Sequence, residues 1–503
     1  MKRGSITLQL SLILGLSLSL VLYSIRSVRV ADGRVLMASA LEQGLYSLFA
    51  GYDRDLYQEY GLLFLDGGYG EKDFQPGRLC GEVTDAAEYI VDPGKGRGGA
   101  DKTLSGFQIT RGEITGYLLA TDDSGAEFQR QIQQIMTERL GTAGLRMLAA
   151  ELTQGREISG NQGEYWQSAD AEGALQEYEE QKQAAQTQEP ETAVSFSGGS
   201  KKTALLAEKT VDTEENLPED FQNPIDTIQG CMDMGILSLA VPDPGNLSSY
   251  TLDQEKLVSS RTLQRGMGMV PEEESGAFDK LLMLEFLAET FPCYTSGSQE
   301  EGLKYQVEYA IGKKSSDREN LKIVLERLML IREASNFLYL MTSPVRGAQA
   351  DQMALTISLM ILMPQAQPLI SLVLKICWAY GESILDLRTL LKGGKIPLVK
   401  NDSTWQLALS GLSDVLLEPG QGEKSENGMD YTWYLRLLLL AESQESLTGA
   451  AMDLTEHNIR VRYKRPEFSL DSCVCAAEIR LTGQADSRQI QITRSYGYDM
   501  QKE

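Results

Sequence analysis

Histidine is almost absent from this sequence, and cysteine is sparse and scattered. The 503 residues include one histidine, His457, and six cysteines, none of them in a Cys-x-x-Cys pair. A multi-histidine metal centre is therefore excluded, and the strongest sequence sign of a zinc site is missing. No disulfide framework emerges from such spacing, and we expect mostly buried thiols. The sequence predicts neither a bound metal nor a cofactor.

Basic residues are outnumbered along the whole chain. Lysine and arginine together number 47, against 71 aspartates and glutamates, which gives a net charge of −24. Because no basic stripe is available to neutralise phosphates, nucleic acid is excluded as a partner. The same balance argues against binding to an anionic membrane surface beyond an anchor. It favours a soluble, self-repelling body.

Charge is missing entirely from residues 6–25, which are mostly leucine, isoleucine and serine. About twenty such residues span the ~30 Å hydrocarbon core of a bilayer as one helix. Three interpretations compete: a cleaved secretory signal, a plain single-pass anchor, and a short basic leader that is cut before the helix. A secretory signal has a shorter apolar core of about 7–15 residues, and the one small-residue cleavage motif, at residues 38–40, lies well beyond it.

The charges on either side of this helix do not decide its orientation. Lys2 and Arg3 precede it, while Arg26, Arg29 and Arg34 follow it, so the positive-inside bias has no clear direction. Large domains translocate largely regardless of charge. We expect a single-pass protein of the cell membrane, with its large domain outside the cytoplasm, chiefly because of the family resemblance described next.

The pair Gly4-Ser5 stands directly before the apolar helix. This start resembles that of minor pseudopilins of tight-adherence (Tad) pili and their relatives in Gram-positive bacteria. The resemblance implies a leader of residues 1–4, cut by a prepilin peptidase between Gly4 and Ser5. It also implies contacts with membrane lipid, other pilin-like subunits and the Tad assembly machinery. Gln9 stands where these proteins usually carry glutamate, and we expect it to be the strongly polar helix-packing residue of the anchor.

Further segments extend the resemblance along the chain. They are residues 60–66, 223–226, 235–239, 315–339 and 382–388. These segments look like a family of large anchored proteins in Gram-positive anaerobes, whose function is not established. The resemblance therefore implies a pseudopilin-like component encoded with Tad-type export machinery, and it assigns no catalytic residue.

The sequence divides into five parts, and the predicted fold class is α+β. Residues 1–4 are the expected leader, residues 5–30 a transmembrane helix, and residues 31–152 a stalk helix with a small α+β domain. Residues 153–223, rich in glutamine and glutamate, have too little apolar surface to order fully, and we expect a linker or surface excursion there. Residues 224–503 are predicted to be a larger, mainly helical domain ending in a β-hairpin.

Hydrophobic periodicity predicts the elements of the first half. The spacing of apolar residues predicts a stalk helix over 31–60. Strands are predicted over 60–66, 107–110 and 114–119, and a helix over 126–152.

The second half is predicted to be mostly helical. Some helix is expected near 171–185, a capping box at Ser316 opens another, one more begins at Tyr431, and residues 468–498 alternate as a hairpin. Residues 353–380 are nearly as apolar as the N-terminal helix, but two prolines divide them into runs too short to cross a bilayer. Two buried helices are the favoured interpretation, with a membrane re-entrant pair as the alternative.

No motif in the sequence marks an active site. There is no Gly-x-Ser-x-Gly elbow, and His457 is interpreted as a polar residue near a helix end rather than a catalytic base. Residues 312–315 lack the glycine spacing of a phosphate loop, and Ser315 is assigned to a helix start. Cys473 and Cys475 lie two apart on a strand and point to the same side. Because that side continues as apolar residues, core packing is favoured over metal binding.

Two pairs of acidic residues are candidates for a catalytic or cation-binding role. Glu382 and Asp386 lie four residues apart on an apolar helix, with Arg388 and Lys375 nearby in sequence. Paired carboxylates suit acid–base catalysis, but the favoured interpretation is a structural ion-pair set at the end of a buried helix. The aspartates at 122–123 are suited to a cation, yet helix capping already explains them.

These observations predict a membrane-anchored extracytoplasmic protein that is not an enzyme. The resemblance makes it a pseudopilin-like component associated with Tad-type pilus assembly or secretion. The alternative is an anchored surface enzyme or a ligand-binding receptor whose site the sequence does not mark.

Overall fold

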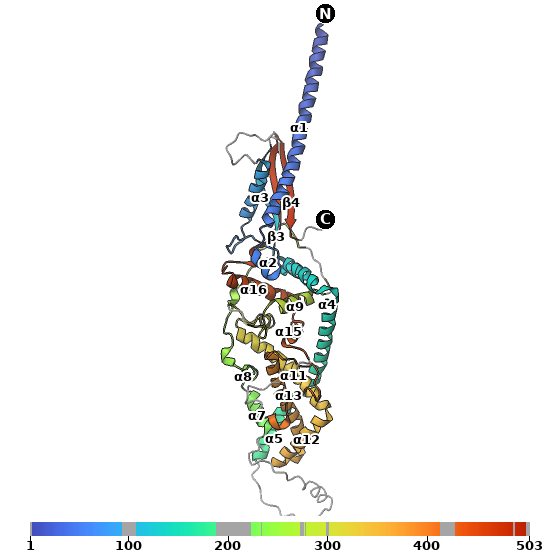
Figure 1. The fold of residues 1–503 in the computed structure, drawn as a ribbon, viewed down its shortest axis with the longest axis vertical. Helices are drawn as coiled ribbons and strands as arrows, with labels where there is room; N and C mark the ends of the chain where they lie inside the picture. The colour runs from blue at the N-terminus through green and yellow to red at the C-terminus, as the bar shows by residue number, and fades with distance from the viewer. Residues whose placement is uncertain are drawn as a thin grey trace, which may run out of the picture.

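The computed structural model confirms the predicted α+β fold class. It describes residues 3–92, 107–187, 223–232, 234–271, 276, 278–297, 301–412, 428–485 and 488–498. Figure 1 shows an elongated molecule, in which a long N-terminal helix projects from a small sheet and a helical body lies beyond that sheet. The last strands of the chain return to this sheet, so both ends of the sequence meet in it.

A single helix, α1 (Arg3–Phe49), opens the fold. Its first part projects away from the body, and from Gly33 onward it packs against the sheet and α3 (Pro76–Val91). The apolar helix thus continues into a stalk, as predicted, but the stalk ends well before residue 60. Asp53 then caps a separate short helix, α2 (Arg54–Tyr60).

One antiparallel sheet joins the two ends of the chain. Its central strand, β3 (Cys473–Ala485), pairs with β2 (Phe107–Leu119) along one edge and with β1 (Leu65–Asp66) and β4 (Arg488–Gly497) along the other. The C-terminal hairpin predicted from alternation is confirmed as β3–β4. It belongs, however, to the sheet beside α1 and not to the helical domain to which the sequence assigned it. The two neighbouring strands predicted in the first half are one strand, β2, with register irregularities.

The second part of α1 and α3 form a core of their own with the sheet. Its buried members include Met37, Ala40, Leu41, Leu45, Leu79, Val83, Phe107, Ile479, Leu481 and Ile490. At Gly33 α1 lies very close to the sheet, because a Cβ atom there would lie 3.1 Å from Cδ2 of Phe107. This distance is tighter than an ordinary van der Waals contact, so a larger residue at position 33 would require the Phe107 ring to shift by a few tenths of an ångström.

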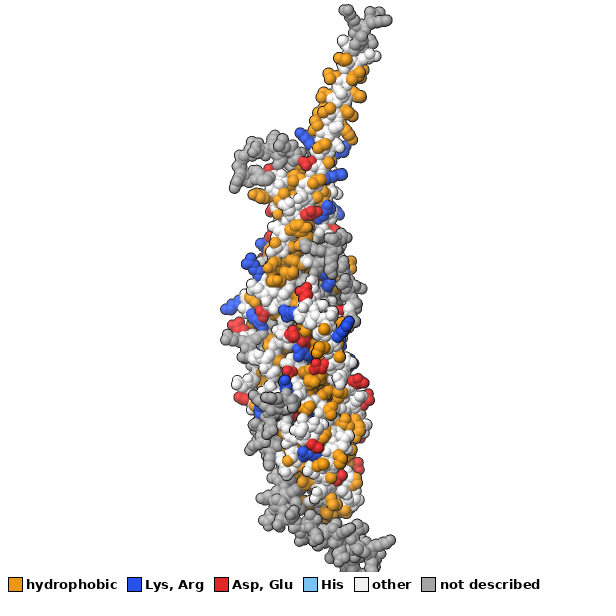
Figure 2. All heavy atoms as spheres, turned by 45° about the vertical axis from the view of Figure 1, so that its right-hand side comes forward, with side chains coloured by type: hydrophobic (Ala, Val, Ile, Leu, Met, Phe, Trp, Pro, Cys, Tyr) orange, Lys and Arg blue, Asp and Glu red, His pale blue; other side chains and the backbone are white. Residues whose placement is uncertain are grey.

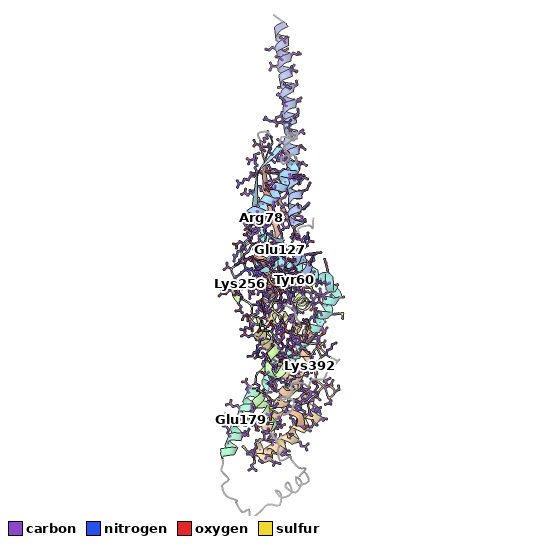
Figure 3. All side chains as sticks on the ribbon, turned by 60° about the vertical axis from the view of Figure 1, so that its left-hand side comes forward. Tyr60, Arg78, Glu127, Glu179, Lys256 and Lys392 are labelled. Carbon is purple, nitrogen blue, oxygen red and sulfur yellow. The ribbon has the colours of Figure 1, made fainter. Side chains whose placement is uncertain are left out.

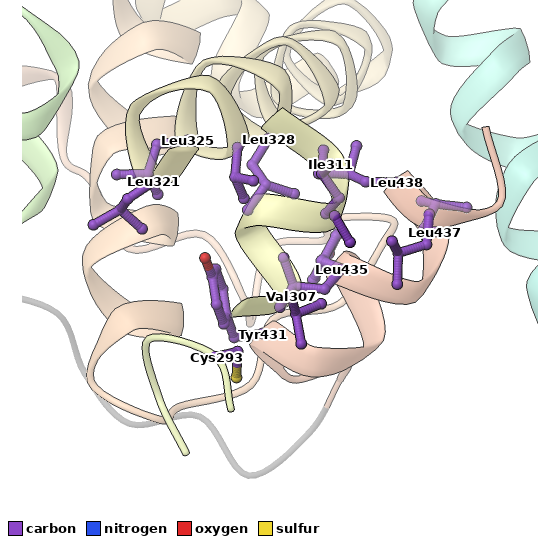
Figure 4. Packing of buried hydrophobic residues seen from close by; sticks show 14 of the residues in the cluster. Cys293, Val307, Ile311, Leu321, Leu325, Leu328, Tyr431, Leu435, Leu437 and Leu438 are labelled. Atoms are coloured by element: carbon purple, nitrogen blue, oxygen red, sulfur yellow. The ribbon is translucent and has the colours of Figure 1, made fainter. Parts of the chain in front are cut away.

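The rest of the described chain forms the helical body. Its helices are α4 (Asp122–Ser168), α5 (Ala171–Thr187), α7 (Pro224–Met232), α8 (Ile236–Ala240), α9 (Asp279–Thr290), α10 (Gln306–Gly312), α11 (Asp317–Thr342), α12 (Pro344–Met360), α13 (Gln367–Leu391), α15 (Tyr431–Leu439) and α16 (Gln444–Arg462). Short 3-10 turns join them at η1 (Pro244–Asn246), η2 (Gln254–Lys256), η3 (Pro364–Ala366), η4 (Leu409–Gly411) and η5 (Leu470–Ser472). Figure 4 shows how apolar side chains of α10, α11 and α15 interlock in its core.

Most of the described part of the predicted linker is helical. α4 runs on to Ser168, well beyond the predicted end near residue 152, and α5 agrees with the helix predicted near 171–185. Tyr178 of α5 is buried, and α5 packs against α13. Tertiary packing therefore orders a segment whose own apolar content is low. The remainder of the predicted linker, residues 188–222, lies outside the described residues.

Two helices in the described part of the chain are long and apolar enough to cross a membrane. The apolar stretch of α1 is wholly exposed, whereas 78% of the corresponding stretch in residues 364–391 is buried. α13 is thus a core helix of the body, in line with the favoured interpretation of this segment. α12 packs beside it, with Leu359 and Met360 exposed.

Candidate membrane-contacting helix

The projecting part of α1 carries exposed apolar side chains from Leu8 to Ile25. Figure 2 shows hydrophobic side chains along most of the coloured part of this helix above the basic residues at its base, and Leu16, for example, is 75% exposed. The large exposed apolar residues are Leu8, Leu10, Leu12, Ile13, Leu14, Leu16, Leu18, Leu20, Val21, Leu22, Tyr23 and Ile25. Soluble monomers rarely expose contiguous apolar patches beyond a few hundred Å². A helix that is hydrophobic all round suits a lipid environment instead.

The serine hydroxyls of this stretch are satisfied within the helix. Each Oγ atom donates to a backbone carbonyl three or four residues earlier: Ser11 to Leu8 at 2.9 Å, Ser17 to Leu14 at 2.9 Å, Ser19 to Leu16 at 2.8 Å, and Ser24 to Leu20 at 2.9 Å. An unpaired polar group in hydrocarbon is costly. These internal bonds therefore lower the free energy of placing the serines in lipid.

The three N-terminal residues singled out from the sequence all lie in this one helix. Gly4 and Ser5 belong to its first turns, and Gln9 is exposed one to two turns later. In lipid, a neutral amide costs less than a carboxylate. Between residues 7 and 25, Gln9 is the one side chain that carries an amide.

Aromatic and polar contacts fasten the end of α1 to the last strand. The Phe49 ring lies 5.2 Å from the rings of both Tyr496 and Tyr498, measured between centroids. The Tyr498 hydroxyl donates to the Phe49 carbonyl at 2.8 Å, and Arg494 Nε lies 2.8 Å from Glu42 Oε1. Sequence reasoning missed these contacts because they join residues more than four hundred positions apart.

An arginine ties the helical body to the sheet region. Arg465, just after α16, pairs with Asp53 at 2.7 Å and with Asp55 and Asp66 at 2.9 Å each. Asp53 caps α2, and Asp66 belongs to β1. The stalk, the sheet and the body are therefore linked by ion pairs as well as by packing.

Glu382 and Asp386 form the buried ion-pair set that the sequence favoured. Lys400 Nζ lies 2.6 Å from Glu382 Oε1 and 2.7 Å from Asp386 Oδ1, and Arg332 Nε lies 2.9 Å from Asp386 Oδ2. All four side chains are fully buried. Burial raises the pKa of Glu382 despite Lys400. For Asp386 the effect of burial is outweighed by Lys400 and Arg332, which hold its pKa below the ordinary value.

The partners suggested by sequence proximity are wrong for this set. Arg388 Nε donates instead to a backbone carbonyl of α8 at 2.8 Å, and Lys375 pairs with Asp351 at 3.1 Å. Lys400 and Arg332 come from other segments of the chain. Tertiary packing alone brings them to the carboxylates, so sequence spacing gave no signal for them.

His457 lies inside α16, close to its end, with its ring centroid 5.5 Å from that of Tyr250. Burial, reinforced by Arg460 and Arg462, lowers the pKa of His457 to about 4. The imidazole is therefore neutral near pH 7. Among the described residues, no hydrogen-bond partner lies against its buried Nε2 atom.

All six cysteines are buried and free, which confirms the expectation of buried thiols. Cys473 and Cys475 of β3 belong to the core, as their alternation predicted, and burial raises the pKa of both. Within the part of the chain that is described, no three histidine, cysteine, aspartate or glutamate side chains are placed to hold a metal ion.

The capping role predicted for the aspartates at 122–123 is wrong. Asp122 accepts hydrogen bonds from the amides of Leu119 at 2.7 Å and Gly266 at 2.8 Å, so it ties the end of β2 to a neighbouring segment. Asp123 has φ +49° and stands in a left-handed turn rather than at a cap. The capping box at Ser316 is confirmed on its N-cap side, since its side chain accepts from the Glu319 amide at 3.2 Å.

The projecting apolar helix and the attached body define the class of this molecule. It is an α+β protein whose N-terminal helix is long and apolar enough to span a membrane. The chain belongs to the family of unknown function DUF5702, whose model matches residues 214–485. The matched region runs through most of the helical body to the end of β3, and it leaves out α1, β2 and β4. No curated protein and no solved structure matches the chain.

Proposed function

We propose that this protein is a non-enzymatic, single-pass membrane protein with an extracytoplasmic body. We assign it a role as a pseudopilin-like component associated with Tad-type pilus assembly or secretion. The continuity of α1 carries the proposal, because its first half is apolar and exposed while its second half is built into the sheet. At 1.5 Å per residue, residues 6–25 extend ~30 Å, which matches the hydrocarbon core of a bilayer.

The projecting helix offers surfaces to neighbouring helices in the membrane. Ser11, Gly15 and Ser19 follow one another at four-residue spacing, and small residues in this pattern let helices approach closely in lipid. No neighbouring atom lies within 4 Å of a Cβ built at Gly15, so this side is open. Gln9 projects from another side and offers its amide to a second neighbour. Pilin-like subunits supply helices of this kind.

N-terminal processing tests the pilin-like part of the proposal. Cleavage by a prepilin peptidase predicts a mature chain that begins at Ser5, measured by intact mass of the membrane-extracted protein. A Gly4→Leu variant should keep its leader, whereas Leu8→Ala, a change within the helix, should still be cut. An intact leader in the natural sequence, or a cut near Ala40, contradicts the pseudopilin assignment.

Thiol labelling tests the side of the membrane on which the body lies. All six native cysteines are buried, so an impermeant maleimide reports only on an introduced residue. Glu180 is exposed on α5, next to Glu179, which Figure 3 labels at the end of the body far from α1. We expect Glu180→Cys to react in intact cells and the natural sequence to stay unlabelled. Reaction only after lysis would put the body in the cytoplasm.

A ligand-binding receptor is the second candidate, and one cavity favours it. This cavity of ≈ 410 Å³ is lined in part by Ser259, Tyr309, Lys313 and Asp453. Asp453 accepts hydrogen bonds from Ser259 Oγ at 2.6 Å and from the Tyr309 hydroxyl at 2.9 Å. The volume and the polar groups suit a small ligand. Native mass spectrometry that finds a stoichiometric small molecule or metal on the purified chain would favour a receptor or enzyme over the non-enzymatic component.

A further inference from the structure

Arginines gather where α1 leaves its apolar stretch. Arg26, Arg29 and Arg34 are all exposed, and Asp32 is the one acidic residue among them in the sequence. Figure 2 shows basic side chains around the base of the apolar stretch. This local excess of positive charge contrasts with the net charge of −24 of the whole chain. Residues 26–34 therefore carry a local excess of positive charge that the chain as a whole does not have.

One end of the sheet lies beside these arginines. Gly33 of α1 meets Phe107, the first residue of β2. Phe107 pairs with Ala485 of β3, which in turn pairs with Arg488 of β4. Arg488 and the adjacent Gln489 are both exposed. The sheet thus brings a fourth arginine to the level at which α1 enters the body.

Helix geometry gives the distance of these residues from the end of the apolar stretch. At 1.5 Å per residue, Gly33 lies about 12 Å beyond the last apolar residue of the stretch. A bilayer of ~40–45 Å with a ~30 Å core leaves roughly 5–8 Å of headgroup layer on each side. With residues 6–25 in the core, Arg26 and Arg29 lie within that layer. Arg34 lies about 13–14 Å past residue 25, roughly 6–8 Å outside that layer, and Arg488 lies near the same level; a long arginine side chain can extend across most of that distance.

We propose that these four residues, the arginine collar (Arg26, Arg29, Arg34 and Arg488), dock the membrane-proximal end of the sheet onto anionic lipid headgroups. The proposal rests on the proposed membrane anchor and extends it to the body. Each basic residue near an anionic surface strengthens binding about fivefold, and guanidinium groups match phosphate oxygens with paired hydrogen bonds.

The same electrostatics orient the rest of the molecule. An anionic surface repels the acidic body while it attracts the collar. Because α1 is fixed to the sheet and the sheet to the body, the long axis is held away from the membrane plane. The net charge of −24 sums over residues far from the membrane, whereas binding to a lipid surface depends on the charges that lie near it.

Lipid-borne quenchers test the collar in the full-length chain, reconstituted into bilayers. A fluorophore on Gln489→Cys reports contact with nitroxide lipids labelled at the headgroup, and the buried native thiols stay unlabelled. We expect stronger quenching in bilayers that contain phosphatidylglycerol than in pure phosphatidylcholine, and loss of that difference at high salt. Arg34→Gln/Arg488→Gln should lose most of the difference. Lys256→Gln/Lys322→Gln, which removes two exposed cations from the body, should keep it.

A second label separates the collar from the anchor. A fluorophore on Leu16→Cys should be quenched by acyl-chain nitroxides in either bilayer. If it is quenched while the label at position 489 responds equally to neutral and anionic lipid, the collar proposal fails and the anchor stands. If the control pair of lysine substitutions abolishes the difference as fully as the arginine pair, the collar proposal also fails. A Leu16 label that escapes quenching overturns the anchor and the collar together.

Discussion

Replacing Lys400 with methionine should strongly destabilise the helical body. The ammonium group is fully buried and bonds Glu382 at 2.6 Å, Asp386 at 2.7 Å and the Thr404 carbonyl at 3.1 Å. Methionine keeps most of the side-chain volume but leaves two buried carboxylates with only Arg332 of the original cations. Breaking a buried ion pair by removing one partner costs about 3–5 kcal/mol. We expect a loss of about 4 kcal/mol in the free energy of unfolding.

Urea unfolding of the detergent-solubilised chain, followed by circular dichroism, measures this loss. Lys375→Met is the matched control, because Lys375 pairs at 3.1 Å with Asp351, whose side chain is 54% exposed. Such pairs contribute only about 0–1 kcal/mol. The denaturant slope should stay the same in both variants, so that midpoints can be compared. If Lys400→Met proved as stable as Lys375→Met, the reasoning about the buried network would be refuted.

Three more perturbations test separate parts of the structure. Burial lowers the pKa of His457 from 6.5 to about 4. As the pH falls from 6.5 to 4, the unfolded chain is therefore protonated at His457 before the folded chain is, and the free energy of unfolding should fall. In urea titrations at different pH values, His457→Phe should flatten this dependence. Gly33→Val should lower the free energy of unfolding by about 1–3 kcal/mol, because its Cβ would lie 3.1 Å from the Phe107 ring. Gly15→Val should leave the free energy of unfolding unchanged, because no neighbouring atom lies within 4 Å of a Cβ at that position. Gln9→Leu should keep α1 in alkali-washed membranes yet reduce chemical cross-linking to neighbouring subunits, and undiminished cross-linking would contradict a packing role for Gln9.

Features that depend on local sequence were predictable. The uncharged run at 6–25 identifies an apolar helix by its length alone. Alternation predicted β3 and the burial of Cys473 and Cys475, and the spacing from Ser316 to Glu319 predicted a cap. Each of these signals lies within a few residues, so no knowledge of the tertiary fold was needed.

Features that depend on distant partners were not predictable. The alternating pattern of β3–β4 would be the same whether the hairpin pairs with β2 or packs on helices. Only the structure shows that it pairs with β2 in the sheet beside α1. For Glu382, the sequence suggested partners that lie nearby along the chain. Its actual partner, Lys400, lies in a loop after α13. Helix α5 has few apolar residues, and it is ordered by contact with α13. In each case the deciding contact is remote in sequence.

The most direct test of the whole account is the partition of the full-length chain between membrane and soluble fractions. Cells are lysed, membranes are washed with alkaline carbonate and then with high salt, and the protein is followed by immunoblot. With residues 6–25 lodged in lipid, the chain should remain in the washed membranes and be released only by detergent. Recovery of the intact chain as a freely soluble protein would contradict the account.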